Sequence, residues 1–296
     1  MAPHWKCGSG QPVAGSNPAL SATTPGALEA KPCVAGCAAP LTHIRVRSRR
    51  MLAGAFALAP FAPSRRLMPR LPEITPIEYG TFRFPDPALA RRRGVVVGYA
   101  IRHRGGVFLF DTGLGFGNAE LEETYHPEAR RVEEALAGAG FVIDDVTAIA
   151  NCHLHADHAG QNLAFPGVPI YVQAAEWELA HTTDHTILEW VDFPGATYLP
   201  LTGDHEPFDG FRIIATPGHT KGHQSLAVQT DHGLVVLAGQ AVYTLDEWVG
   251  NADELEGRSG APDRDAYDRS LERLRGLEPR HVYFGHDRRS WTRSGS

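Results

Sequence analysis

The chain has 296 residues, of which 43% are hydrophobic, so it is long enough to bury one large α/β core or two small ones. Its formal charge of −6 argues against general binding of nucleic acids or anionic membranes, because both need a basic surface. We therefore expect neither as a partner, and the composition leaves a homodimer open.

The first 70 residues differ from the rest of the chain. They contain nine Lys or Arg residues and one acidic residue. Residues 1–44 are rich in Ala, Pro, Gly, Ser and Thr and lack hydrophobic periodicity, which is typical of disorder. We interpret 1–70 as a disordered or non-native leader, with Met51 and Met68 as candidate starts, and 71–296 as the folded domain. A cytoplasmic location is the expectation that follows.

Residues 48–62 allow a second interpretation. Arg49 and Arg50 precede a short apolar run at 53–62, as in a twin-arginine export signal. The run is too short to cross a membrane, and Pro60 interrupts it. Export is therefore the alternative to a cytoplasmic location.

From about residue 71 the sequence predicts short strands alternating with helices. Residues 94–102 and 106–110 are apolar runs separated by a polar turn, which predicts a hairpin. Further strands are predicted at 146–151, 211–215, 225–230, 234–238 and 282–284, and helices at 127–139, 174–181 and 263–277. This mixture is typical of an α/β architecture in which helices cover the sheets.

A dense group of metal-binding side chains follows the strand predicted at 146–151: His153, His155, Asp157 and His158. Positions i and i+2 of an extended chain point to the same side, so His153 and His155 can bind one ion. Asp157 and His158 lie just beyond, where they can face a second ion. Imidazole and carboxylate groups suit zinc and related divalent metals. Because four such groups would be costly to leave unpaired at a buried strand end, the cluster predicts a metal site.

Further candidate ligands follow other predicted strands. His219 comes after the strand at 211–215, Gln240 after the strand at 234–238, and His286 after the strand at 282–284. Ligands from several strand ends commonly meet at one edge of an α/β scaffold. Six other isolated histidines are interpreted as ordinary surface or core residues: His126, His181, His185, His205, His232 and His281.

These motifs resemble the metallo-β-lactamase superfamily over about residues 75–287. They occur in the order of that family: 111–113 (Asp-Thr-Gly), the histidine cluster, 218–219 (Gly-His) and 285–287 (Gly-His-Asp). The resemblance implies an αββα sandwich of class α/β (α+β), with two mixed β-sheets flanked by helices and the metals at the sheet edge. It also implies two divalent metal ions, with zinc the first choice. The implied ligands are His153, His155 and His219 for the first ion, and Asp157, His158 and His286 for the second.

Within the superfamily, the chain is most similar to the N-acyl homoserine lactonases. Residues 158–162 (HAGQN), residues 216–226 and Tyr243 carry this resemblance. In those enzymes a tyrosine lies three residues after a metal-bridging aspartate, and here Tyr243 lies three residues after Gln240. The resemblance implies hydrolysis of a lactone or carboxylic ester. The expected small-molecule substrate is an N-acyl homoserine lactone, which makes quorum quenching the expected biological effect.

The implied reaction is attack on the lactone carbonyl by metal-bound hydroxide. Asp157 would bind metal and carry a proton to the leaving alkoxide. Tyr243 would donate a hydrogen bond to the developing oxyanion. His223 and Asp111 would orient ligands instead of binding metal themselves.

Gln240 departs from the family pattern, in which this position is usually the bridging aspartate. An amide oxygen can coordinate a metal, but it is neutral and cannot bridge two cations as a carboxylate does. The second ion is therefore expected to bind more weakly. The alternatives to a lactonase are a glyoxalase II-like thioesterase, a phosphotriesterase, or a metal-binding protein that lost turnover through Gln240. Because the other motifs are intact, we favour an active lactonase with an altered metal preference.

Overall fold

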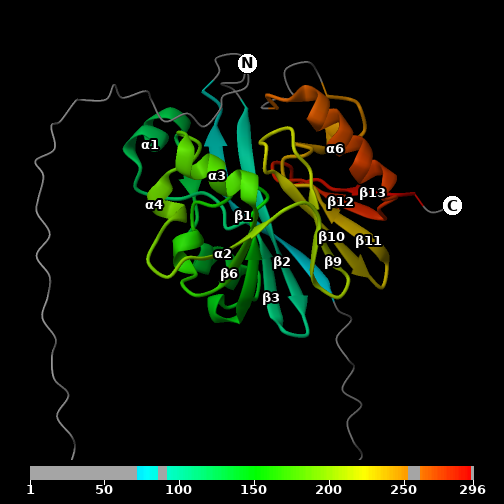
Figure 1. Ribbon diagram of the computed structural model, residues 1–296, viewed down its shortest axis with the longest axis horizontal. Coiled ribbons are helices and arrows are strands. Elements are labelled where there is room, and N and C mark those ends of the chain that lie inside the picture. The colour runs from blue at the N-terminus through cyan, green and yellow to red at the C-terminus, as the bar shows by residue number, and fades with distance from the viewer. Residues whose placement is uncertain (1–71, 86–91, 253–260, 295–296) are drawn as a thin grey trace, which may run out of the picture. The chain divides into compact units, whose positions relative to one another are not determined.

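The computed structural model describes residues 72–85, 92–252 and 261–294. These residues form two mixed β-sheets packed face to face, with helices on the outer faces (Figure 1). The αββα sandwich expected from the motifs is thus confirmed. The proposed leader at 1–70, with its export alternative, lies outside the described residues. Within the described ranges, no helix is both long enough and apolar enough to cross a membrane.

The seven-stranded sheet has the order β4-β1-β2-β3-β5-β6-β7. Its strands are β1 (Glu73–Arg83), β2 (Arg93–His103), β3 (Gly106–Phe110), β4 (Glu128–Ala129), β5 (Val146–Ala150), β6 (Pro169–Gln173) and β7 (Thr197–Leu201). Strands β1, β2 and β3 pair antiparallel, whereas β3, β5, β6 and β7 run parallel. The helices on this side of the sandwich are α1 (Ala119–Tyr125), α2 (Val132–Gly138), α3 (Ala174–Thr182) and α4 (Leu188–Val191).

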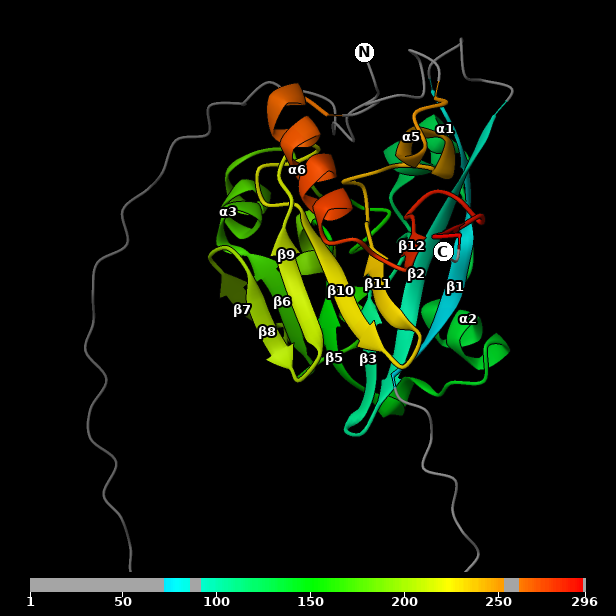
Figure 2. The same cartoon turned by 90° about the vertical axis from the view of Figure 1, so that its right-hand side faces the viewer.

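The six-stranded sheet has the order β13-β12-β11-β10-β9-β8. Its strands are β8 (His205–Phe208), β9 (Phe211–Ala215), β10 (Gln224–Thr230), β11 (Gly233–Leu237), β12 (His281–Tyr283) and β13 (Trp291–Thr292). The long helix α6 (Arg264–Gly276) lies across the outer face of this sheet, and the short helix α5 (Leu245–Trp248) lies near one end of it (Figure 2).

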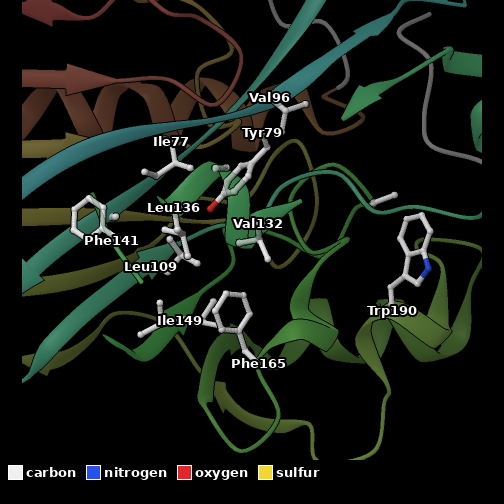
Figure 3. Packing of buried hydrophobic residues seen from close by; sticks show 14 of the residues in the cluster. Ile77, Tyr79, Val96, Leu109, Val132, Leu136, Phe141, Ile149, Phe165 and Trp190 are labelled. Carbon is white, nitrogen blue, oxygen red and sulfur yellow. The ribbon is translucent and has the colours of Figure 1, made fainter. Parts of the chain in front are cut away.

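Alternating side chains of the central strands produce the layers. On β3, Phe108 and Phe110 pack in the cluster between the sheets, while Val107 and Leu109 pack on the outer side with Leu136 of α2. Figure 3 shows this outer cluster. The period of two is that of a strand buried on both faces. Each fully buried side chain of this kind stabilises the fold by roughly 1.5–3 kcal/mol relative to an exposed one.

The second sheet follows the same rule. On β11, Val235 and Leu237 point into the cluster between the sheets, whereas Val236 packs in an outer cluster with Leu274 of α6. Both sheets therefore sit between apolar layers. This leaves their edges as the place where polar side chains from several strands can converge.

Most predicted elements are confirmed within one or two residues, but the helix predicted at 127–139 is wrong at its start. Glu128 and Ala129 form β4, which pairs antiparallel with Thr81 and Gly80 of β1, and α2 begins only at Val132. Tertiary pairing with an existing strand overrides the local helical spacing here. The sequence patterns also do not predict the strands β1, β6, β7 and β8.

Candidate metal centre

The predicted ligands meet at one edge of the sandwich, where β5, β9, β11 and β12 end. Their loops are short and run directly from the strand into the ligand. All of the predicted metal-binding side chains are buried: His153, His155, Asp157, His158, His219, Gln240 and His286. Seven buried polar side chains at one edge require partners, because an unpaired buried polar group is costly.

The first cluster consists of His153, His155 and His219. His153 Nε2 lies 2.8 Å from His155 Nδ1, and His219 Nε2 lies 3.1 Å and 3.2 Å from these two atoms. In a tetrahedral zinc site with Zn–N distances of about 2.0–2.1 Å, ligand nitrogens lie about 3.3 Å apart. Burial and the neighbouring imidazoles hold the pKa of His153 well below its usual range, so this ring is neutral and has a free lone pair. The trio fits a divalent metal ion.

The second cluster consists of Asp157, His158 and His286. His158 Nε2 lies 3.2 Å from His286 Nε2, and Asp157 Oδ2 lies 3.4 Å and 3.5 Å from the same two nitrogens. Both carboxylate oxygens of Asp157 are buried and lack a hydrogen-bond partner within the described ranges. Burial raises the pKa of Asp157, but His158 and His286 lower it by more, so the carboxylate is charged. A buried, charged carboxylate close to two imidazole nitrogens fits a second cation.

Hydrogen bonds behind the second cluster fix its rings. Asp111 accepts the backbone N–H of Cys152 through Oδ1 at 2.7 Å and the Nδ1–H of His158 through Oδ2 at 2.9 Å. His286 donates its Nδ1–H to the carbonyl of Val95 on β2, at 2.7 Å. In both histidines Nε2 is therefore the nitrogen left to bind a metal.

His223 lies behind the site and supports it. Its Nε2 accepts the backbone N–H of Gln240 at 2.9 Å, so its Nδ1–H is the donor to the carbonyl of Thr216 at 3.1 Å. Burial holds the pKa of His223 well below its usual range, which keeps it neutral. Both ring nitrogens are used in these hydrogen bonds, and the orienting role expected of this histidine stays a prediction.

Comparison with known proteins covers the part of the chain that contains these candidate ligands. Residues 91–286 match the family model of the metallo-beta-lactamase superfamily. The chain belongs to this superfamily. It is 32% identical to an N-acyl homoserine lactonase of Bacillus cereus over 205 residues, which cover 64% of this chain and 80% of that protein. It is 34% identical to the N-acyl homoserine lactonase AttM of Rhizobium radiobacter over 173 residues, which cover 53% of this chain and 64% of that protein.

Solved structures show the same likeness. An N-acyl homoserine lactone hydrolase with the product N-hexanoyl-L-homoserine bound at its catalytic metal centre superposes with a TM-score of 0.63 and 27% identity, covering 73% of this chain and 94% of that one. The superfamily membership and the similarity to lactonases expected from the motifs are thus confirmed. The ligand assignments of individual residues stay predictions.

Gln240 is the residue expected from the family resemblance to replace a bridging aspartate. Gly239, immediately before it, has a φ of 60°, and a Cβ there would lie 2.6 Å from Cys152 Cβ. Only glycine lets the chain pass this closely. Gln240 is 4% exposed, and its Oε1 is buried without a hydrogen-bond partner in the described part of the chain. An amide oxygen left in this state costs roughly 1–3 kcal/mol, which coordination of a cation would offset.

Tyr243 lies against the second cluster. Its ring stacks on that of His286, with centroids 4.3 Å apart and planes at 22°. Burial and the charge of Asp157 raise the pKa of Tyr243 far above its usual range. The phenol therefore keeps its proton and can donate a hydrogen bond at neutral pH.

Three residues at the metal centre were not predicted from the sequence. Cys152 places Sγ 3.1 Å from His153 Nδ1 and 3.3 Å from His158 Nδ1, and burial raises its pKa, so it remains a thiol. Glu176 is fully buried, and His185, interpreted above as an ordinary histidine, packs on His155. Nothing in the local sequence around Glu176 and His185 distinguishes them from surface residues of a helix and its following loop.

Proposed function

We propose that this chain is a metal-dependent hydrolase that opens the lactone ring of N-acyl homoserine lactones. The observation that carries the proposal is the convergence of two buried ligand trios with Tyr243, in a chain 32% identical to an N-acyl homoserine lactonase. The substrate is a small molecule, and the biological effect of its hydrolysis is quorum quenching.

The two trios would hold two divalent metal ions, of which zinc suits the imidazole and carboxylate donors best. Such ions, when bound, supply Lewis-acid polarisation of a carbonyl and lower the pKa of water at the site. His153, His155 and His219 would hold one ion. Asp157, His158 and His286 would hold the other, with Gln240 offering its amide oxygen nearby.

The chain itself supplies proton transfer and oxyanion stabilisation. The charged carboxylate of Asp157 takes a proton from the attacking water and returns it to the ring oxygen when the ester C–O bond breaks. The neutral phenol of Tyr243 donates a hydrogen bond to the oxygen on which negative charge develops. The products are the open acyl homoserine, with one carboxylate and one hydroxyl group, and a released proton.

A second hypothesis is that the protein binds metal but has lost catalytic turnover because of Gln240. The Oε1 of Gln240 is buried and has no hydrogen-bond partner among the residues that the structure describes. This favours a working ligand over a degenerate residue, because a position that had lost its role would be expected to find a partner or solvent. We therefore infer an active site adapted to a neutral ligand, with a weaker second ion.

The proposal is tested by comparing substrate classes on the full-length, metal-loaded protein. N-acyl homoserine lactones with short and long acyl chains are followed by proton release, beside an S-acyl thioester and a phosphotriester. We expect the lactones to have the highest kcat/KM. Faster turnover of the thioester or the phosphotriester, without turnover of lactones, would contradict the proposal. Metal binding without turnover of any class would support the hypothesis of lost activity.

A further inference from the structure

Glu176 is a buried carboxylate that is not a predicted ligand. It lies in the first turn of α3 and is 0% exposed. Glutamate is almost never fully buried unless it is paired. The partners of this carboxylate therefore indicate why it is there.

The carboxylate of Glu176 joins the two loops that carry the first ligand trio. Oε1 accepts the backbone N–H of Leu154 at 2.9 Å, and Oε2 accepts the hydroxyl of Thr220 at 2.6 Å. Leu154 lies between His153 and His155, and Thr220 directly follows His219. One rigid group thus spans the loop after β5 and the loop after β9.

The backbone of α3 also packs directly against the second of these loops. A Cβ at Gly222 would lie 2.3 Å from the backbone nitrogen of Glu176. Only glycine at position 222 allows the loop after His219 to approach the start of α3 this closely. The carboxylate therefore contacts both loops from a fixed support.

His185 completes the arrangement. Its Nε2 lies 2.5 Å from Glu176 Oε1, and its ring packs on that of His155 with centroids 4.4 Å apart. Burial raises the pKa of Glu176, but His185, Leu154 and Thr220 together lower it below its ordinary value. The group is a charged carboxylate with a donor on each side.

We propose that Glu176, held by His185, is a positioning residue that sets the spacing of His153, His155 and His219. Neither residue belongs to the candidate ligand groups found among the described residues. The proposal rests on the metal centre of the proposed function but not on its substrate. Partners of this kind behind metal ligands typically change metal affinity about 10- to 100-fold when they are removed.

Two substitutions of Glu176 separate the effect of its side-chain length from the effect of its charge. Glu176→Asp keeps the charge but shortens the side chain by about 1.5 Å, so it cannot span both loops. Glu176→Gln keeps the side-chain length but removes the charge. Its amide oxygen can still accept the backbone N–H of Leu154, and its N–H₂ group can donate to the hydroxyl of Thr220, so it can still span both loops. Glu178 is exposed on the same helix, and Glu178→Asp is the matched control.

The test measures metal binding by the full-length protein. Zn²⁺ affinity is obtained by competition with a chromophoric chelator, and the Co²⁺ form gives an absorption spectrum that reports ligand geometry. Circular dichroism of each metal-free variant shows that it is folded. We expect Glu176→Asp to weaken the tighter ion about 10- to 100-fold and to shift the Co²⁺ spectrum, Glu176→Gln to do so less, and the control to match wild type.

Three results would overturn the proposal. Wild-type affinity and an unshifted Co²⁺ spectrum in Glu176→Asp would show that spacing does not depend on this residue. A larger loss in Glu176→Gln than in Glu176→Asp would show that charge, not reach, matters. Wild-type metal binding in His185→Phe, which keeps a ring against His155 but loses the donor, would remove His185 from the arrangement. Because every readout is metal binding, a failed lactonase assay leaves this test intact.

Discussion

Replacing Asp111 with asparagine changes the two acceptor oxygens behind the second ligand cluster and little else. Asp111 has a φ of 65°, a left-handed conformation that asparagine adopts more readily than most residues. The backbone is therefore expected to stay in place. What changes is the acceptor pair that faces the backbone N–H of Cys152 and the Nδ1–H of His158, at 2.7 Å and 2.9 Å.

The size of the effect follows from counting donors and acceptors. A carboxylate offers an oxygen to each of the two N–H groups, whereas an asparagine offers one oxygen and one N–H₂ group. The N–H₂ group of the asparagine must then face one of the two N–H donors, and that donor loses a charged acceptor. Hydrogen bonds to charged groups contribute about 1.5–3 kcal/mol, which corresponds to about a 10- to 150-fold loss of affinity if it falls on His158 as a metal ligand.

The assay is a metal titration against a competing chelator, with two ions resolved. We expect Asp111→Asn to weaken the ion bound through His158 and to leave the ion bound through His153, His155 and His219 nearly unchanged. Asp144→Asn is the control, because Asp144 is exposed and undergoes the same chemical change. Unchanged affinity for both ions in Asp111→Asn would refute the orienting role, and an equal loss of both ions would show that the two clusters are not separate sites.

Three further predictions concern individual side chains. Gln240→Asp restores the negative charge that the family resemblance implies at this position, so we expect tighter binding of the second ion but lower kcat with the preferred metal; a large gain in kcat would instead show that Gln240 is a degenerate residue. Tyr243→Phe keeps the stacking on His286 but removes the O–H donor, so kcat should fall by about 100-fold with unchanged metal affinity, and an unaltered kcat would exclude Tyr243 from the reaction. The pKa of His103 is lowered by burial and its Nε2 is buried without a hydrogen-bond partner in the described residues. A lowered folded-state pKa means that stability is fully present above the unfolded pKa of about 6.5 and falls as the pH drops below it. His103→Phe should therefore lose less stability than wild type between pH 7 and pH 5 in urea unfolding, and an identical pH dependence would contradict this.

Much of the candidate metal centre is encoded locally and could be predicted. His153, His155, Asp157 and His158 lie within six residues, and strand periodicity places them at a strand end. Likewise, the runs that become β2, β3, β9, β10 and β11 are mostly apolar without alternation, because each strand contributes to two apolar layers. Short-range patterns suffice wherever ligands or core residues repeat at fixed spacing.

The residues that were missed depend on contacts distant in sequence. Glu176 is 22 residues from Leu154 and 44 from Thr220, and nothing near it predicts that a carboxylate on a helix will be buried. His185 acquires its place only because the loop after α3 returns to His155. Similarly, β4 forms because β1 presents a free edge to Glu128 and Ala129, which local helical spacing cannot reveal.

Metal-dependent lactone hydrolysis is the central activity proposed for this protein. Ring opening of an N-acyl homoserine lactone should be measured by proton release with the purified protein, after removal of metal with a chelator, and after addition of Zn²⁺, Mn²⁺, Co²⁺ or Fe²⁺. We predict that chelation abolishes turnover and that at least one added ion restores it. Turnover that survives complete metal removal, or no turnover with any ion despite binding of two ions per chain, would contradict the account.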